Sequence, residues 1–264
     1  MPQGKGRPLA DSRWTILSIQ TAMVVGALLL WEWMTKEQLL NPLFFGQPTT
    51  IAAYAIEALM DGSLLRAAGI TVLETLYGFA TGMLLGTALG LGLWWSVSVA
   101  RVLEPLLVLF NAIPKVTLAP ILIVLLGVGL WMKVALAFLN VVILAALTAY
   151  LGAKQADPDF MDLVRSVGGS TWQVFYRVVL PSAFPGIISS MKIGTSLAFI
   201  GAVVGEFLAA REGLGYLAIY GSNIFNMSLI MVAVLGLLLL ALALFAAVRT
   251  FEDWLLGWRP RVEF

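Results

Sequence analysis

Residues 134–151 read VALAFLNVVILAALTAYL, an apolar stretch without a single charged side chain. A helix needs about 20 mostly apolar residues to cross a lipid bilayer. We therefore predict that this stretch forms a membrane-spanning helix. Residues 228–248 are equally free of charge and predict a second one. Together the two stretches indicate an integral membrane protein.

The composition of the whole chain supports this conclusion. Of 264 residues, 60% are hydrophobic and 12% are charged, whereas a soluble domain has about 45–50% apolar and about 25% charged residues. The chain has no His and no Cys, which excludes disulfides, thiolate nucleophiles and Cys-ligated metals. Chemistry by Asp or Glu stays possible, and an intramembrane carboxylate enzyme would need Glu74 and Glu206, the two deep candidates, to be brought together. We expect no catalytic residue, metal site or cofactor. A net charge of +1 argues against nucleic acid as a partner.

Four further stretches are long and apolar enough to span, and each contains one or two charged residues. They are residues 14–33, 70–97, 106–131 and 185–208. The first follows a basic segment, as a signal peptide would, but its apolar run is too long and no small-residue cleavage site follows. We interpret it as a retained helix. The expected fold is all-α with six transmembrane helices.

The distribution of Lys and Arg predicts the orientation in the membrane. Six spans place both termini on one side, and that side holds ten basic residues, against four on the other. The four are Lys36, Arg66, Lys133 and Arg211. Because Lys and Arg accumulate in cytoplasmic segments, both termini are expected to be cytoplasmic.

Small residues recur at helical spacing in two of the predicted spans. Gly78, Gly82, Gly86 and Gly90 repeat every fourth residue, which predicts a face for close helix packing. In residues 185–208, the side opposite a similar stripe carries Lys192, Ser196, Phe199 and Glu206. This side either lines a translocation path, or its charged ends extend to opposite membrane interfaces. Lys192 and Glu206 are about 20 Å apart along the helix and cannot pair with each other.

Residues 106–131 are predicted to form a broken helix. Pro114 and Pro120 each remove a backbone donor, and Asn111, Lys115 and Thr117 cluster around them. Backbone groups without partners are tolerated at membrane depth only inside protein or beside water. The cluster is either a kink with neighbouring polar side chains or a part of a translocation path.

The connection over residues 152–184 contains the most specific pattern in the sequence. Asp157 and Pro158 predict the start of a short amphipathic helix, Gly168-Gly169 its end, and Ser170 the cap of a second helix that stops near Leu180-Pro181. The segment is the one sizeable cytoplasmic surface that we expect, and it has the form of a knob on which another protein could dock.

This knob resembles the "EAA…G…LP" loop of the permease subunits of ATP-binding-cassette (ABC) importers. The run from Asp162 through Gly168 to Leu180-Pro181 carries the resemblance, with Asp162-Leu163-Val164 where Glu-Ala-Ala is usual. Residues 113–120 and 127–129, and then 201–206 and 213–216, are similar to the branch that imports nitrate, sulfonates and taurine. The resemblance covers residues 65 to 250.

The resemblance implies a type I importer permease in a prokaryotic inner membrane. Its implied partners are a second copy of the chain, two ABC ATPase subunits and an extracytoplasmic solute-binding protein. The sequence contains no G-x-x-x-x-G-K-[ST] phosphate loop, so the chain is expected to hydrolyse no ATP itself. The residues implied in ATPase coupling are Asp162, Arg165, Ser166, Gly168, Gly169, Trp172, Leu180 and Pro181.

We expect the solute to be small and anionic, such as nitrate, a sulfonate or taurine, with which Lys115 and Lys192 are compatible. The alternatives are another organic solute, such as a vitamin precursor or an aromatic acid, and an ion-coupled secondary transporter. The candidate path residues are Asn111, Lys115, Thr117, Lys192, Ser196, Phe199 and Glu206. Residues 1–13 and 252–264 are expected to be cytoplasmic tails around a permease domain of residues 14–251. Residues 41–66, with a surface helix over 48–60, and residues 206–228 are candidate contacts for the binding protein.

Overall fold

The computed structural model describes residues 13–255, and every regular element within this range is helical. The expected all-α membrane fold is confirmed. Residues 1–12 and 256–264, which hold most of the two expected tails, lie outside the described residues. The main helices are α1 (Arg13–Lys36), α3 (Pro48–Met60), α4 (Ser63–Gly92), α5 (Val97–Ala112), α6 (Ala119–Leu126), α7 (Leu130–Lys154), α8 (Pro158–Ser166), α10 (Leu180–Ala209), α11 (Leu214–Asn223) and α12 (Met227–Leu255).

The centre of the molecule consists of α4, α7 and α10 packed side by side. The predicted glycine stripe of α4 lies against α7: a Cβ on Gly82 would come within 2.7 Å of Val141 Cβ, and one on Gly86 or Gly90 would meet the α7 backbone. Helix α10 approaches α7 as closely, since a Cβ on Gly201 would lie 2.7 Å from Ala137 Cα. The glycines therefore let three backbones approach closely.

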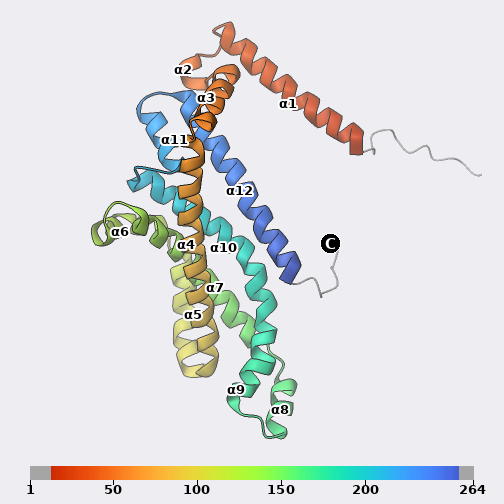
Figure 1. Cartoon of the computed structure of the whole chain (residues 1–264). Helices are drawn as coiled ribbons and strands as arrows, with labels where there is room; N and C mark the ends of the chain where they lie inside the picture. Colours follow the sequence, from red (N-terminus) through yellow and green to blue (C-terminus); the bar gives the residue numbers. More distant parts are fainter. Residues whose placement is uncertain (1–12, 256–264) are drawn as a thin grey trace, which may run out of the picture.

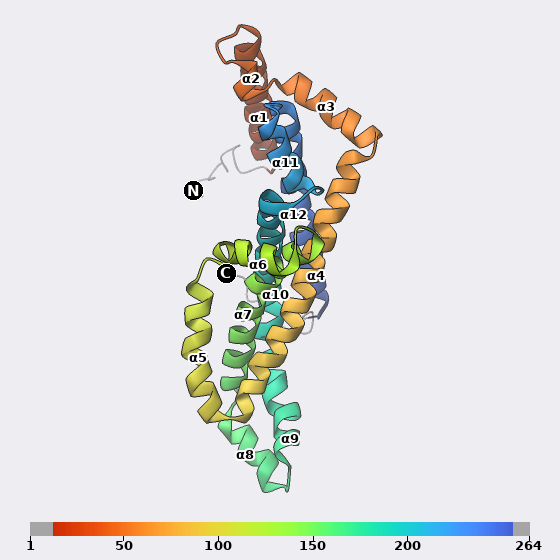
Figure 2. The ribbon, with the colours of Figure 1, turned by 90° about the vertical axis from the view of Figure 1, so that its left-hand side faces the viewer.

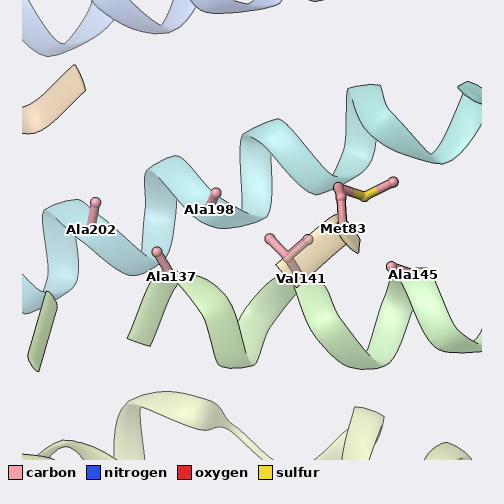
Figure 3. Close-up of a cluster of buried hydrophobic side chains, with 6 residues drawn as sticks. All are labelled: Met83, Ala137, Val141, Ala145, Ala198 and Ala202. Carbon is pink, nitrogen blue, oxygen red and sulfur yellow. The ribbon is translucent and has the colours of Figure 1, made fainter. Parts of the chain in front are cut away.

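The side chains between these three helices are small and fully enclosed. Figure 3 shows Ala137, Val141 and Ala145 of α7 next to α10, which contributes Ala198 and Ala202 to the same buried cluster, with Met83 of α4 near Val141. Elsewhere on the helices, large apolar side chains such as Leu84 and Leu239 point outward. An apolar exterior around a small-residue interior is the pattern that a lipid environment favours.

Five helices in the described range are long and apolar enough to span a membrane, and a bent pair makes six if it crosses as one broken span. The bent pair is α5 and a segment that runs from a 3-10 turn at Lys115–Leu118 into α6. Their axes meet at 89°, and Figure 2 shows α6 running across the bundle while α5 runs along it. The predicted break at Pro114 is confirmed, but the helix begins at Val97 and not at residue 106.

The two ends of the bundle carry different elements. In Figure 1, α2 (Pro42–Phe45), α3 and α11 gather at one end, and α8 and α9 (Thr171–Val174) lie at the other. The predicted surface helix over 48–60 is confirmed as α3. Glu32 of α1 accepts hydrogen bonds from Gln47 Nε2 (2.8 Å) and from the backbone N–H of Thr49 (3.1 Å). A carboxylate of α1 thus caps the start of α3 and joins the two helices.

Candidate coupling surface and candidate translocation path

The knob at one end of the bundle starts from two capped helices. The Asp157 side chain accepts a hydrogen bond from the N–H of Asp159 at 2.9 Å, and Pro158 stands at the first helical position. Ser170 and Gln173 form a reciprocal capping box at the start of α9. Each cap satisfies backbone donors that a helix start leaves free. The two predicted helix starts are confirmed.

The turn between α8 and α9 requires both of its glycines, for different reasons. Gly168 has φ of +81°, and nothing lies within 4 Å of the position that a Cβ would take, so its constraint is the left-handed backbone. Gly169 has an ordinary φ, but a Cβ there would meet the carbonyl oxygen of Val164 and lie 2.5 Å from its Cγ1. The N–H of Gly169 donates to that same carbonyl at 2.9 Å.

Helix α8 carries an exposed ion pair on one face and exposed apolar side chains on the opposite face, which borders a groove toward Arg177 and Pro181. Arg165 Nη1 lies 3.0 Å from Asp162 Oδ1, and Ser166 Oγ donates to the Leu163 carbonyl at 2.8 Å. Phe160 and Leu163 are each 59% exposed. Large apolar side chains on a polar helix that projects from the end of the bundle are typical of a protein-binding surface.

Trp172 connects the knob to the neighbouring corner of the bundle. Its ring centroid lies 5.6 Å from that of Trp95, which closes the 3-10 turn after α4, and 5.6 Å from that of Phe175. Trp95 and Phe175 are 4.5 Å apart. Tilted aromatic pairs at these separations attract one another beyond their area of contact. The sequence alone does not explain a Trp at position 172, whereas the structure places its ring in this aromatic cluster.

The prediction that the second knob helix stops near Leu180-Pro181 is wrong. Helix α9 continues through a π-helical turn at Phe175–Val179 directly into α10. The wider hydrogen bonding of the π turn changes the register just before the proline, so Pro181 stands in the first turn of α10, where a missing N–H is tolerated. Helix α9 of the knob and the central helix α10 are therefore one continuous rod, to which α8 is joined through the glycine turn.

The seven candidate path residues lie in three separate places. Asn111, Lys115 and Thr117 gather at the bend between α5 and α6, where Lys115 Nζ donates to the Asn111 carbonyl at 2.6 Å. Lys192 of α10 pairs with Glu252 of α12 at 2.5 Å. Ser196 and Phe199 line a small groove between the same two helices. As expected, Lys192 and Glu206 do not pair.

Glu206 belongs to a buried polar cluster at the junction of α4, α10 and α11. It is 1% exposed and accepts hydrogen bonds from Thr71 Oγ1 (2.7 Å) and from the N–H of Gly215 (2.6 Å). The N–H of Leu214 donates to Thr71 Oγ1 at 3.0 Å. A carboxylate at the start of α11 compensates the free N–H groups there. Its closeness requires glycine at 213, where a Cβ would overlap the carboxylate.

Beside this cluster is an ion pair that no sequence pattern brings together. Lys133 Nζ of α7 contacts Glu74 Oε1 of α4, and the two residues are 4% and 0% exposed. Lys133, which the predicted spans leave in the connection between them, lies inside α7, whose first residue is Leu130. The sequence signal for such a pair is that Glu74 is the single charged residue of its predicted span. Its partner lies 59 positions further along the chain (133 − 74), beyond the reach of a sequence pattern.

The ion pair lies beside a cleft. This cleft has a volume of about 510 Å³ and lies between α4, the loop before α7 and the segment before α11. Glu74 and Lys133 form its polar floor, Leu73 and Tyr77 its apolar wall, and Arg211 stands at its edge.

The chain matches a known protein family over most of its length. The model of the family described as binding-protein-dependent transport system inner membrane component matches residues 78–257. The formylaminopyrimidine transport permease protein ThiX of Halalkalibacterium halodurans is 31% identical over 234 residues, which are 89% of this chain and 93% of that protein. The taurine transport system permease protein TauC of Escherichia coli is 24% identical over 257 residues, 96% of this chain and 93% of that protein.

Solved structures share the fold. A chain of the inward-facing MetNI methionine ABC transporter superposes with a TM-score of 0.61 at 20% identity, covering 72% of this chain and 94% of that one. A second crystal form of the same transporter gives a TM-score of 0.59 at 18% identity, covering 75% and 96%. At this level of identity the likeness concerns the architecture alone.

Proposed function

We propose that this chain, which belongs to the family of binding-protein-dependent transport system inner membrane components, forms the translocation path of an ATP-driven importer. It is a multi-pass inner-membrane protein with the type I importer permease fold. The observation that carries the proposal is the knob. Its two helices are capped at their starts, joined by a glycine turn and carry exposed apolar side chains, as is typical of a surface that binds another protein. The second of them, α9, continues without a break into α10 in the core.

The partner on the knob is proposed to be an ABC ATPase. Asp162 and Arg165, held together in an exposed ion pair, would exchange contacts with charged residues of the ATPase groove. Gly168 and Gly169 set the angle between α8 and α9, and Trp172 fixes α9 against the end of α4. Leu180 and Pro181 lie where the rod enters the bundle. Motion of the knob would therefore reach α10 directly and α4 through the aromatic cluster.

The remaining partners follow from the proposed mode of action. A second copy of the chain would complete the pore, two ATPase subunits would occupy the two knobs, and an extracytoplasmic binding protein would deliver the solute. With the knob on the cytoplasmic side, the other end of the bundle faces outward. Helices α3 and α11 lie at that end (Figure 1) and are the proposed contacts for the binding protein.

For the solute, we propose a small organic molecule rather than a simple anion, and the surroundings of one lysine support this. Both lysines that favoured an anion in the sequence are engaged: Lys192 with Glu252, and Lys115 with the Asn111 carbonyl. Lys192, already neutralised by a carboxylate, attracts an anion weakly, whereas Lys115 donates to an uncharged carbonyl and keeps its charge. The relatives are named for formylaminopyrimidine, riboflavin, taurine and sulfonates. We propose a nitrogen-containing organic solute similar to formylaminopyrimidine, with taurine-like solutes as the alternative.

Co-purification tests the proposed coupling. The tagged chain is co-expressed with the phosphate-loop ATPase encoded beside it, and ATPase recovery and ATP-driven uptake into proteoliposomes are measured. Leu163→Asp places a charge on the exposed apolar face of α8 and should abolish both. Met60→Asp, at an 84% exposed apolar residue of α3 at the other end of the bundle, should leave ATPase recovery unchanged. Uptake that persists after ATP depletion would point instead to an ion-coupled secondary transporter.

A further inference from the structure

Three ionisable side chains meet in an enclosed space where α4, α7 and α10 pack together. Glu74, Lys133 and Glu206 are 0%, 4% and 1% exposed. Lys133 Nζ contacts Glu74 Oε1, and the carboxyls of Glu74 and Glu206 lie within hydrogen-bonding reach of each other. The two deep carboxyls that an intramembrane carboxylate enzyme would need are thus brought together, but both are too enclosed to reach a substrate.

The charges of this cluster do not balance if both carboxyls are ionised. The Lys133 ammonium would then face two carboxylates, and one negative charge would be buried without a partner. Burying an unpaired charge is costly, and two carboxylates in one site repel each other, so that such a pair tends to keep one proton. A single proton would leave the cluster neutral, with one ammonium, one carboxylate and one carboxylic acid.

No second cation among the described residues balances the extra carboxylate. Arg211 lines the cleft beside the cluster, but its side chain is exposed, and it forms no ion pair with a carboxylate of the described range. Its neighbour Glu212 is exposed as well and pairs with Arg66. Within the described part of the chain, the ammonium of Lys133 is therefore the one cation at ion-pair distance from the cluster.

The hydrogen bonds around the two carboxyls also indicate a proton between them. Glu206 Oε1 accepts from Thr71 Oγ1 and Oε2 from the N–H of Gly215, whereas Glu74 Oε2 is buried and receives no hydrogen bond from a described donor. Two ionised carboxylates are acceptors only and cannot hydrogen-bond to each other. A carboxylic acid, in contrast, donates to a carboxylate in a short, charge-assisted bond. A single proton therefore supplies the donor that the pair lacks.

We propose that Glu74 and Glu206 share one proton, which makes the buried cluster neutral and joins α10 to α4. Lys133 compensates the remaining negative charge, and Glu206 at the same time caps the start of α11. The proton thus helps to hold α11, one of the proposed contacts for the binding protein, on the bundle. The proton site belongs to this chain alone and does not depend on the proposed importer function.

Infrared spectroscopy of the full-length chain tests the shared proton, at neutral pH and in a maltoside detergent, which has no carbonyl group. The wild type should show the C=O stretching band of a protonated carboxyl. Glu74→Gln and Glu206→Gln should each abolish it, because one carboxylate and one ammonium balance without a proton. Glu57→Gln, at an exposed carboxylate of α3, should retain it. The proposal is overturned if the wild type lacks the band, or if either variant of the pair keeps it, because the proton would then belong to a single residue.

Thermal unfolding gives a second, independent measurement. Both carboxyls are ionised in an unfolded chain at neutral pH, so the wild type takes up one proton when it folds. Its unfolding temperature should therefore fall from about pH 6 to about pH 9, and fall less in Glu74→Gln and Glu206→Gln, which take up no proton here. Equal pH dependence in all three chains would contradict the proposal.

The charge balance itself can be tested by removing both carboxyls. Glu74→Gln combined with Glu206→Gln leaves Lys133 buried without a partner and should lower the unfolding temperature by about 10 °C or more. Adding Lys133→Met should restore most of this loss. A double variant as stable as the wild type would show that the cluster needs no charge balance and would overturn the proposal. None of these measurements involves the ATPase, so failure of the proton site and failure of the importer proposal are distinguishable.

Discussion

The two adjacent glycines of the knob should be sensitive to substitution for different physical reasons. Gly168 is constrained by its backbone angle, with φ of +81° and open space around it. Gly169 is constrained by space, because a Cβ would meet the Val164 carbonyl oxygen. Asn adopts the left-handed region more readily than other L residues with a Cβ, whereas β-branched residues adopt it least. We therefore expect Gly168→Asn to be tolerated and Gly168→Val to disrupt the turn.

The size of the effect follows from the cost of the left-handed region. It is about 1–2 kcal/mol for an ordinary L residue, and each 1.4 kcal/mol corresponds to about a tenfold change in an equilibrium. If the ATPase binds only the native turn, Gly168→Val should weaken its binding by about tenfold or more. At position 169 even Ala should weaken it. Val164→Ala should not rescue Gly169→Ala, because the nearest atom belongs to the backbone.

Titration of each variant in nanodiscs with the purified ATPase measures these changes, and size-exclusion chromatography checks that the variants remain folded and inserted. The knob lies outside the central α4–α7–α10 packing, so the elution profile should not change. Equal binding by wild type and Gly168→Val would refute the reasoning. So would equal losses for Gly168→Asn and Gly168→Val, because the backbone angle would then not be the deciding factor.

Other substitutions test the packing, the α1 attachment and the aromatic cluster. Gly86→Val should lower the thermal unfolding temperature in detergent, because its side chain would meet the α7 backbone, whereas Gly69→Ala, in open space on the same helix, should leave it equal or higher. Glu32→Gln should weaken the cap of α3 and increase proteolysis between α1 and α3; unchanged cleavage would contradict this. Trp95→Ala should lower solute uptake per ATP hydrolysed while ATPase binding is retained, and unchanged coupling would show that the cluster transmits no motion.

Features that depend on neighbouring residues were readily predicted from the sequence. The caps at Asp157 and Ser170 involve partners two and three residues away. The break at Pro114 and the surface helix over 48–60 are likewise local, since each is set by proline or by apolar spacing. The glycine stripe of α4 predicted a close-packed face, although it could not name the helix that covers it.

Features that depend on distant residues were missed or misplaced. The predicted spans leave Lys133 between them, because the sequence does not show that α7 begins at Leu130, before this residue. The stop at Pro181 was wrong because a proline ends a helix only where its missing N–H is needed, and the π turn before it removes that need.

The sequence by itself determined that this chain is an all-helical membrane protein with a docking knob, because apolar length, small-residue spacing and caps are properties of a single segment. Only the tertiary structure decided where the buried charges go. Glu74, Lys133 and Glu206 come from three helices and meet in one cluster, while Lys192 turns to Glu252 on a fourth. In the membrane a buried charge must find a partner, and which partner it finds depends on how the helices pack.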